Sequence, residues 1–247
     1  MKLQGKTAIV TGGGRDIGRG CAIKLASEGA NVAINYFSSG EGAESAVEEI
    51  KLAGGNALAL QGDLNSQDGV DALMAKTVEA FGEVDVLVNN TGGLIARKTV
   101  AEMSLEHWLA VMDLNRTSTF LMIKACLQHM KSGAIVNLAS QAGRDGGGPG
   151  AVAYAASKGA VMTMTRGLAK ELGPEIRVNA LCPGMIDTDF HNVFTKDEVR
   201  RTVEAASPVK RQGTPEDIAN LVTFLACDDS TFITGANVDI NGGMLFS

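Results

Sequence analysis

Residues 7–20 read TAIVTGGGRDIGRG. The apolar run Ala8-Ile9-Val10 predicts a short strand covered on both faces, and the glycines after it predict a tight turn into a helix. Such a turn lets the backbone approach a pyrophosphate, and the start of the helix directs free N–H groups at its charge. The same residues also fit a strand–helix turn that binds no ligand. The stretch therefore predicts the first strand–helix unit of an α/β fold and a candidate dinucleotide site.

The same unit recurs along the chain. Further short apolar runs lie at residues 32–34, 57–60, 86–88, 134–136, 178–181 and 238–240. Segments with helical spacing lie between them, and glycines stand where these helices are expected to end, at Gly29, Gly54-Gly55, Gly82, Gly133 and Gly173. Strands that alternate with helices pair in parallel through right-handed crossovers. We expect residues 1–247 to form a single-domain Rossmann fold, a doubly wound parallel sheet of about seven strands with helices on both faces.

Composition narrows the function. The net charge is −6 with 22 Lys and Arg residues, and no basic run is present, which argues against a nucleic-acid partner. The four cysteines are far apart, and the three histidines share no ligand spacing with them, so we expect no metal site and no disulfide framework. No apolar run has the length of a membrane span, and the first strand follows the N-terminus too closely for a signal peptide. We expect a protein of the cytoplasm that acts on a small molecule.

Charge around the turn bears on the choice of cofactor. Proteins that select NAD carry an acid about twenty residues past the glycines, where it binds the ribose hydroxyls. Here the second strand ends Asn35-Tyr36-Phe37-Ser38-Ser39, without a carboxylate before Glu41. Arg15 supplies a positive charge that a 2′-phosphate could meet, unless it points into solvent. These residues favour NADP(H) and leave NAD(H) open.

The segment Tyr154-Ala155-Ala156-Ser157-Lys158 carries the candidate chemistry. On a helix, residues four apart share a face, so an ammonium group lies near a phenol. Lowering a tyrosine pKa from about 10 toward neutrality takes roughly 4 kcal/mol, and a nearby cation acts in that direction. A plain helical surface pair is the alternative. Ser140 favours the functional interpretation, because it ends the fifth strand at the sheet edge where ligands bind.

In the order in which they occur, these segments resemble the short-chain dehydrogenase/reductase family over essentially the whole chain. Residues 11–18 resemble its T-G-x-x-x-G-x-G signature, with Asp16 in place of the middle glycine, and Asn89-Asn90-Thr91-Gly92 is similar to its Asn-Asn-Ala-Gly. The carboxylate of Asp16 should weaken cofactor binding unless Arg15 or Arg19 offsets it. The resemblance implies a catalytic tetrad of Asn115, Ser140, Tyr154 and Lys158. With the turn and the end of the second strand, it implies a cofactor site of Gly12, Gly14, Arg15, Asp16, Ile17, Gly18, Tyr36, Ser38, Asp63, Leu64, Asn90, Thr91, Gly92, Tyr154, Lys158, Pro183, Gly184, Ile186 and Thr188.

The resemblance also implies a substrate lid over roughly residues 189–212. His191 in that segment, Gln141 and Arg144 are the candidate substrate residues, and Arg97 could also suit a polar substrate. Within the family the chain resembles 3-oxoacyl-(acyl-carrier-protein) reductases and, alternatively, bacterial sugar and polyol dehydrogenases. Docking of a carrier protein needs a basic surface near the pocket. Lys131 could serve, but the segment Leu172-Gly173-Pro174-Glu175 is neutral to acidic, which weakens the carrier-protein alternative. A homotetramer is implied by the resemblance. A non-catalytic NADP-sensing regulator should have lost Tyr154 or Lys158, and both are present.

Overall fold

The computed structural model describes residues 1–247 and contains one sheet of seven strands in the order β3-β2-β1-β4-β5-β6-β7. The strands are β1 Thr7–Val10, β2 Asn31–Tyr36, β3 Asn56–Gln61, β4 Val86–Asn89, β5 Gly133–Leu138, β6 Ile176–Pro183 and β7 Asn237–Ile240. Every neighbouring pair is parallel. The strand order reverses between β1 and β4, and ligands bind at such reversals, beyond the carboxyl ends of the strands.

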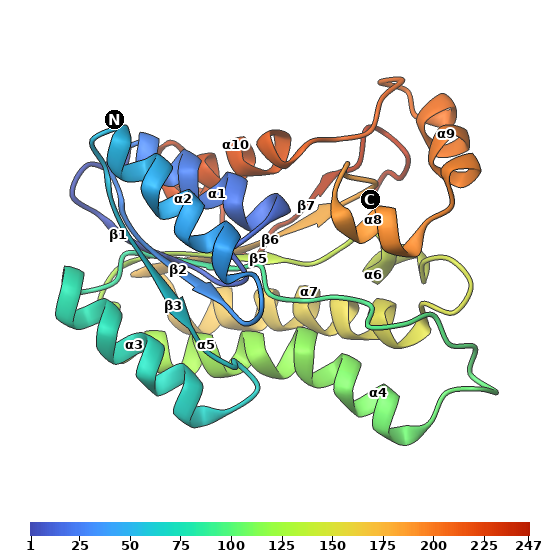
Figure 1. The fold of residues 1–247 in the computed structure, drawn as a ribbon, viewed down its shortest axis with the longest axis horizontal. Coiled ribbons are helices and arrows are strands. Elements are labelled where there is room, and N and C mark those ends of the chain that lie inside the picture. Colours follow the sequence, from blue (N-terminus) through green and yellow to red (C-terminus); the bar gives the residue numbers. More distant parts are fainter.

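Helices cover both faces of the sheet (Figure 1). They are α1 Asp16–Ser27, α2 Gly40–Leu52, α3 Gln67–Phe81, α4 Leu105–Met112, α5 Ser118–Cys126, α6 Ala142–Asp145, α7 Val152–Leu172, α8 Asp189–Phe194, α9 Asp197–Ala206 and α10 Pro215–Ala226. One core cluster packs α1, α2 and α10 against the sheet, and a second packs α3, α5 and α7 against the other face. The predicted doubly wound sheet is confirmed.

All seven apolar runs form strands, and the glycines end helices as expected, except Gly133. Gly29, Gly54 and Gly82 end helices with positive φ angles of 93°, 83° and 81°. Gly133 instead begins β5, and Gly173 caps α7 as expected but with extended backbone, φ −75° and ψ 152°. Gly173 precedes a proline, whose ring disfavours helical backbone in the residue before it.

The helical segment around Asn115 is interrupted. A π-helical turn, Asp113–Thr117, joins α4 to α5. The Asn115 side chain donates to the carbonyl of Val111, at 2.8 Å. In a regular α-helix that carbonyl accepts the backbone N–H four residues later, which is the N–H of Asn115 itself. Competition by its own side chain therefore accounts for the wider turn.

Residues 187–212 leave the body of the protein as one excursion and carry α8 and α9. Ile186 and Gly213 form a parallel bridge at its base, where the N–H of Asp187 donates to the carbonyl of Gly213 at 2.8 Å. Inside the excursion, the Arg200 guanidinium joins Asp187, Asn192 and Gln212. The segment predicted as the lid is thus a folded unit, and it stands at the carboxyl edge of the sheet (Figure 1).

Three further features bear on the expectations. None of the helices is both long enough and apolar enough to cross a bilayer. All four cysteines are buried and unpaired. No three of the His, Cys, Asp and Glu side chains lie close enough together to hold a metal ion.

Candidate active site

The glycine-rich turn is fastened to the end of β4. The hydroxyl of Thr11 accepts the backbone N–H groups of Asn90 and Thr91, at 2.9 and 3.0 Å. The Asn90 amide in turn donates to the carbonyl of Gly12 at 3.0 Å. A Cβ on Gly18 would lie 2.3 Å from that carbonyl, so only glycine fits at the start of α1. The turn and the end of β4 therefore form one rigid wall.

A cavity of about 770 Å³ opens over this wall. The predicted residues that line it are Gly12, Arg15, Asp16, Ile17, Gly18, Ser38, Asp63, Leu64, Asn90, Thr91, Gly92, Ser140, Gln141, Tyr154, Lys158, Pro183, Gly184, Ile186, Thr188 and His191. They come from the carboxyl ends of β1, β2, β3, β4, β5 and β6 and from α7 and α8. Residues from six separate sequence motifs, which were expected to form one site, thus line one cavity.

Four predicted residues do not line the cavity, Asn115 and three others. Gly14 packs under α2, because a Cβ on it would lie 2.3 Å from the Ser39 hydroxyl. Tyr36 packs against the first core cluster instead. Arg144 turns away and pairs with Asp239, Nε to Oδ1, at 2.7 Å. The cavity therefore gives no support to the expected cofactor contacts of Gly14 and Tyr36 or to the substrate contact of Arg144, which stay predictions.

Asn115 is buried behind the cavity. Its amide accepts the N–H of Gly93 at 2.9 Å and donates to the carbonyl of Gly93 at 2.8 Å. With its other hydrogen bond to Val111, both hydrogens of the amide are used, and one lone pair of its oxygen remains. Asn115 therefore shapes the segment after β4, and its place in the catalytic tetrad stays a prediction.

Two features of the wall fit a nicotinamide dinucleotide. No side chain caps α1, so the N–H groups of its first turn stay available to a phosphate. The hydroxyl of Thr91, beside the cavity, is buried without a hydrogen-bond partner, which is rare for a protein group and common where a ligand supplies the partner. Arg15, with a side chain 63% exposed, is free to meet a further phosphate.

Asp16 adopts a φ of 50° in the turn, a conformation that aspartate tolerates better than most residues. Burial raises the pKa of its carboxyl group, and the nearby Arg15 guanidinium lowers it. Arg19, the other candidate to offset this charge, pairs with Glu49 at 2.7 Å. Asp16 thus leaves a carboxylate at the cavity wall, with Arg15 its nearer cation.

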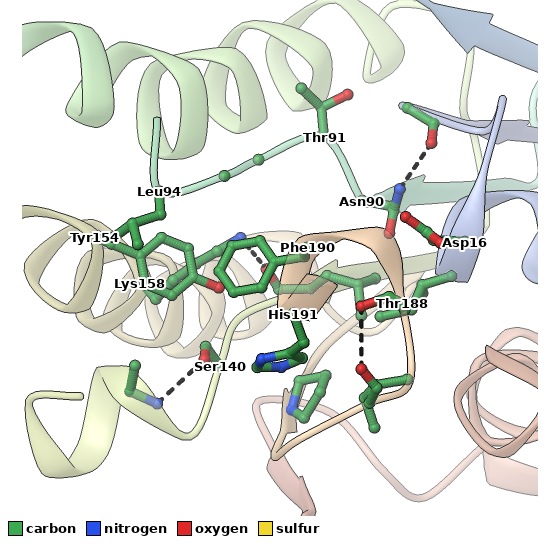
Figure 2. A pocket seen from close by; sticks show the side chains of 18 of the residues that line it. Asp16, Asn90, Thr91, Leu94, Ser140, Tyr154, Lys158, Thr188, Phe190 and His191 are labelled. Carbon is green, nitrogen blue, oxygen red and sulfur yellow. Dashed lines mark hydrogen bonds between the residues drawn. The ribbon is translucent and has the colours of Figure 1, made fainter. Parts of the chain in front are cut away.

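At the other end of the cavity, Tyr154 and Lys158 lie on one face of α7, and Ser140 follows β5 beside them (Figure 2). The Lys158 ammonium is 5.8 Å from the centroid of the Tyr154 ring and donates to the carbonyl of Leu138 at 2.6 Å. Burial raises the pKa of Tyr154, while the Ser140 hydroxyl beside it lowers it. Burial also lowers the pKa of Lys158 to about 8. The expected lowering of the tyrosine pKa by lysine is therefore not seen in the protein alone.

Helix α8, in the segment predicted as the lid, covers the cavity beside Tyr154. Phe190 faces the tyrosine with ring centroids 5.9 Å apart, and His191 lies against Phe190 at 5.1 Å (Figure 2). The Nδ1 of His191 is 2.9 Å from the Thr195 hydroxyl, and burial lowers the pKa of His191 to about 4. His191 is consequently neutral at pH 7, and it lines the cavity. The guanidinium of Arg97 donates to the carbonyls of Phe194 and Pro149, so it is already engaged.

The family model described as Enoyl-(Acyl carrier protein) reductase matches residues 12–245. The chain is 41% identical to the 3-oxoacyl-(acyl-carrier-protein) reductase FabG of Staphylococcus aureus, over 99% of both chains. It is 39% identical to glucose 1-dehydrogenase 2 of Bacillus subtilis, over 98% of this chain and 95% of the relative. The chain belongs to the short-chain dehydrogenase/reductase family. As a short-chain dehydrogenase/reductase it is an oxidoreductase that uses a nicotinamide cofactor, and a non-catalytic regulator is disfavoured.

Solved structures of other proteins support this assignment. A dehydrogenase/reductase from Sinorhizobium meliloti superposes with a TM-score of 0.92 at 39% identity, over 98% of this chain and 96% of that one. A blue fluorescent protein from a metagenomic library, determined in complex with NADPH, superposes with a TM-score of 0.93 at 36% identity over both full chains. The fold of this short-chain dehydrogenase/reductase is thus shared across its whole length.

Several residues of the cavity were not predicted from the sequence. Asn35, Leu94, Asp145, Val199, Val203 and Met244 line it as well. The two valines are four apart on α9, a spacing that predicts one helical face and that could have indicated a lid helix with an apolar underside. Asn35 lies inside β2, where its amide donates to the carbonyl of Gly62 at 3.2 Å, and no sequence signal marks that contact.

Proposed function

We propose that this enzyme reduces the ketone of a 3-oxoacyl thioester with NADPH, in the manner of a 3-oxoacyl-(acyl-carrier-protein) reductase. The observation that carries the proposal is the placement of Tyr154, Ser140 and Lys158 at one end of a cavity whose other end is the glycine-rich turn. When bound, the reduced cofactor supplies the hydride that forms the new C–H bond at the carbonyl carbon. The chain's own residues supply the proton and the orientation.

Tyr154 donates its phenolic proton to the carbonyl oxygen as the C=O bond becomes an alcohol C–O bond. The Ser140 hydroxyl holds that oxygen, and its own oxygen stays fixed by accepting the N–H of Ala142 at 3.1 Å. Lys158 stabilises the phenolate that remains, because its ammonium lies 5.8 Å from the ring centroid in a buried site where charge interactions are strong. The phenol is then restored by a proton from solvent.

The preference for NADP(H) rests on charge. No carboxylate follows β2 before Glu41, and Ser38 and Arg15 line the cavity there. A guanidinium forms paired hydrogen bonds with a phosphate, which NAD lacks at the 2′ position. The NADPH-bound relative is consistent with this choice.

The cavity wall favours an acyl substrate over a sugar. Leu94, Phe190, Val199 and Val203 are apolar, and a polyol would leave its hydroxyl groups without partners against them. Docking of a carrier protein through Lys131 has no support, because Lys131 pairs with Glu83 and lies before β5, at the edge of the sheet opposite the cavity. We therefore propose the thioester as substrate without specifying its carrier.

The test is a panel of 3-oxoacyl thioesters, keto sugars and polyols, each assayed with NADPH and NADH by absorbance of the reduced cofactor. We expect turnover of the thioesters with NADPH. Turnover of sugars or polyols alone would favour the dehydrogenase alternative, for which the Bacillus subtilis relative is the precedent.

We also propose a homotetramer, as the family resemblance implies. Large apolar side chains stay exposed on the helices that follow β4 and on α7, at Leu105, Leu109, Phe120 and Val152. Light scattering of the purified protein tests this, with four times the chain mass of 25.7 kDa expected.

A further inference from the structure

Helix α8 of the lid is held at each of its ends by one side chain from the body of the protein. At its start, the backbone N–H of Asp189 donates to the Oδ1 of Asp16 at 3.2 Å. At its end, the carbonyl of Phe194 accepts from the Nε of Arg97 at 3.0 Å. The first N–H groups and last carbonyls of a helix have no partner within it, so each bond satisfies a group that the helix leaves free.

These two are the only hydrogen bonds that lead from α8 to the body. The remaining side-chain bonds stay within the lid: the Asn192 amide donates to Asp189 and accepts from Arg200, and the Nδ1 of His191 pairs with the Thr195 hydroxyl. The Arg200 network therefore keeps the lid in one piece without fixing where that piece sits. The position of α8 itself depends on Asp16, on Arg97, on the ion pair of Arg15 with Asp189 at 4.0 Å, and on apolar contacts such as that of Phe190 with Tyr154. The far end of the lid is joined to the body separately, by the hydroxyl of Ser207, which donates to the carbonyl of Gly242, and by the ion pair of Arg211 with Asp217.

Asp16 stands at the position where the family signature resembled by this turn has glycine. A glycine has no side-chain acceptor, whereas the Asp16 carboxylate reaches the start of α8 from a backbone with a φ of 50°. Arg15 lies 4.0 Å from the carboxylates of both Asp16 and Asp189 and reduces the repulsion between them. The next residue after Asp189 is Phe190, which faces the tyrosine, so a bond at Asp189 acts directly on the wall of the substrate site (Figure 2).

We propose that Asp16 is a positioning residue that ties the lid to the glycine-rich turn and thereby sets Phe190 and His191 over Tyr154. The Asp16 carboxylate should also weaken cofactor binding, because it borders the cavity where the pyrophosphate of the cofactor would lie. Its two effects have different chemical origins. The tether needs an acceptor oxygen, and the weakened cofactor binding needs a negative charge.

Two variants separate these effects. Asp16→Asn keeps the acceptor and removes the charge, while Asp16→Gly removes both. Asparagine and glycine both tolerate positive φ, so the turn should fold in each variant. Hydrogen exchange of the ligand-free protein reports on the tether through the amides of residues 190–195. We expect these amides to exchange about fivefold faster in Asp16→Gly, as the loss of one typical hydrogen bond predicts, and at the wild-type rate in Asp16→Asn. Amides of β1 serve as the internal control and should not change.

The proposal is overturned if Asp16→Gly exchanges at the wild-type rate in the lid, or if Asp16→Asn exchanges as fast as Asp16→Gly. Titration with NADPH measures the effect of the charge. Both variants should bind NADPH at least as tightly as the wild type does, because both lack the carboxylate. The consequence for turnover rests on the proposed function. With a 3-oxoacyl thioester, KM should rise about fivefold in Asp16→Gly with little change in kcat, and asparagine should restore it. A chain that turns over no ketone would refute the proposed function, while the exchange data would still decide the tether.

Discussion

Replacing Lys158 with methionine should stabilise the protein at neutral pH, by an amount that falls as the pH rises. Lys158 is 4% exposed, and burial lowers its pKa from 10.5 to about 8. At about 1.4 kcal/mol per pKa unit, an ammonium at this position destabilises the fold by about 3 kcal/mol when charged. Losing the hydrogen bond to the carbonyl of Leu138 subtracts about 1 kcal/mol, so we expect a net gain of about 2 kcal/mol at pH 7.

The change of wild-type stability with pH follows from how many protons the folded and unfolded states bind. Because the pKa is lower in the folded state, the unfolded state holds more protons between about pH 8 and pH 10.5, and the wild type gains stability as the pH rises through this window. Methionine has no such dependence. The greater stability of Lys158→Met should therefore disappear as the pH rises. Above the pKa of the lysine in the unfolded state, the variant should be less stable than the wild type by about 1 kcal/mol.

Urea unfolding of both proteins at one protein concentration, at several pH values from about 7 to 10, measures this difference. The matched control is Lys51→Met on α2, where the side chain is exposed and no trend is expected. A free-energy difference between wild type and Lys158→Met that stays constant over this range would show that the ammonium is not destabilised by burial. Turnover should be lost in the variant at every pH, since the group that stabilises the phenolate is gone.

Three further substitutions test separate parts of the assignment. Tyr154→Phe should keep NADPH binding, measured by cofactor fluorescence, and lose about 10²–10⁴-fold in kcat; an active variant would refute the role of the phenol. Arg15→Ala should weaken NADPH binding about tenfold and leave NADH binding unchanged, and an equal loss for both cofactors would disprove its contact with the 2′-phosphate. Arg144→Met leaves the Asp239 carboxylate, whose side chain is 16% exposed, without its partner, so the free energy of unfolding should fall by about 3 kcal/mol. KM for the ketone should not change in that variant, and a large rise would restore Arg144 to the substrate site.

The sequence predicted the sheet well because its signal is local. A run such as Val86-Leu87-Val88 is apolar without alternation, and only a strand covered on both faces requires that. The site followed from the fold, since Ser140 and Asn90 come directly after strands whose carboxyl ends meet at one edge. Arg144 could not be placed in this way, because its partner Asp239 lies 95 residues further along the chain. Nor could the bond between Asp16 and Asp189, which joins positions 173 residues apart.

The bridge between Ile186 and Gly213 brings the two stems of the lid together. Residues between these stems can be lengthened, shortened or exchanged while the flanking strand and helix keep their places, as with an insertion at a loop tip. Because the lid is attached in this way, its sequence can change between related enzymes, and with it their substrate preference, without compensating changes in the hydrophobic core. Chimaeras joined at these two residues are accordingly the most economical route to altering which ketones this enzyme accepts.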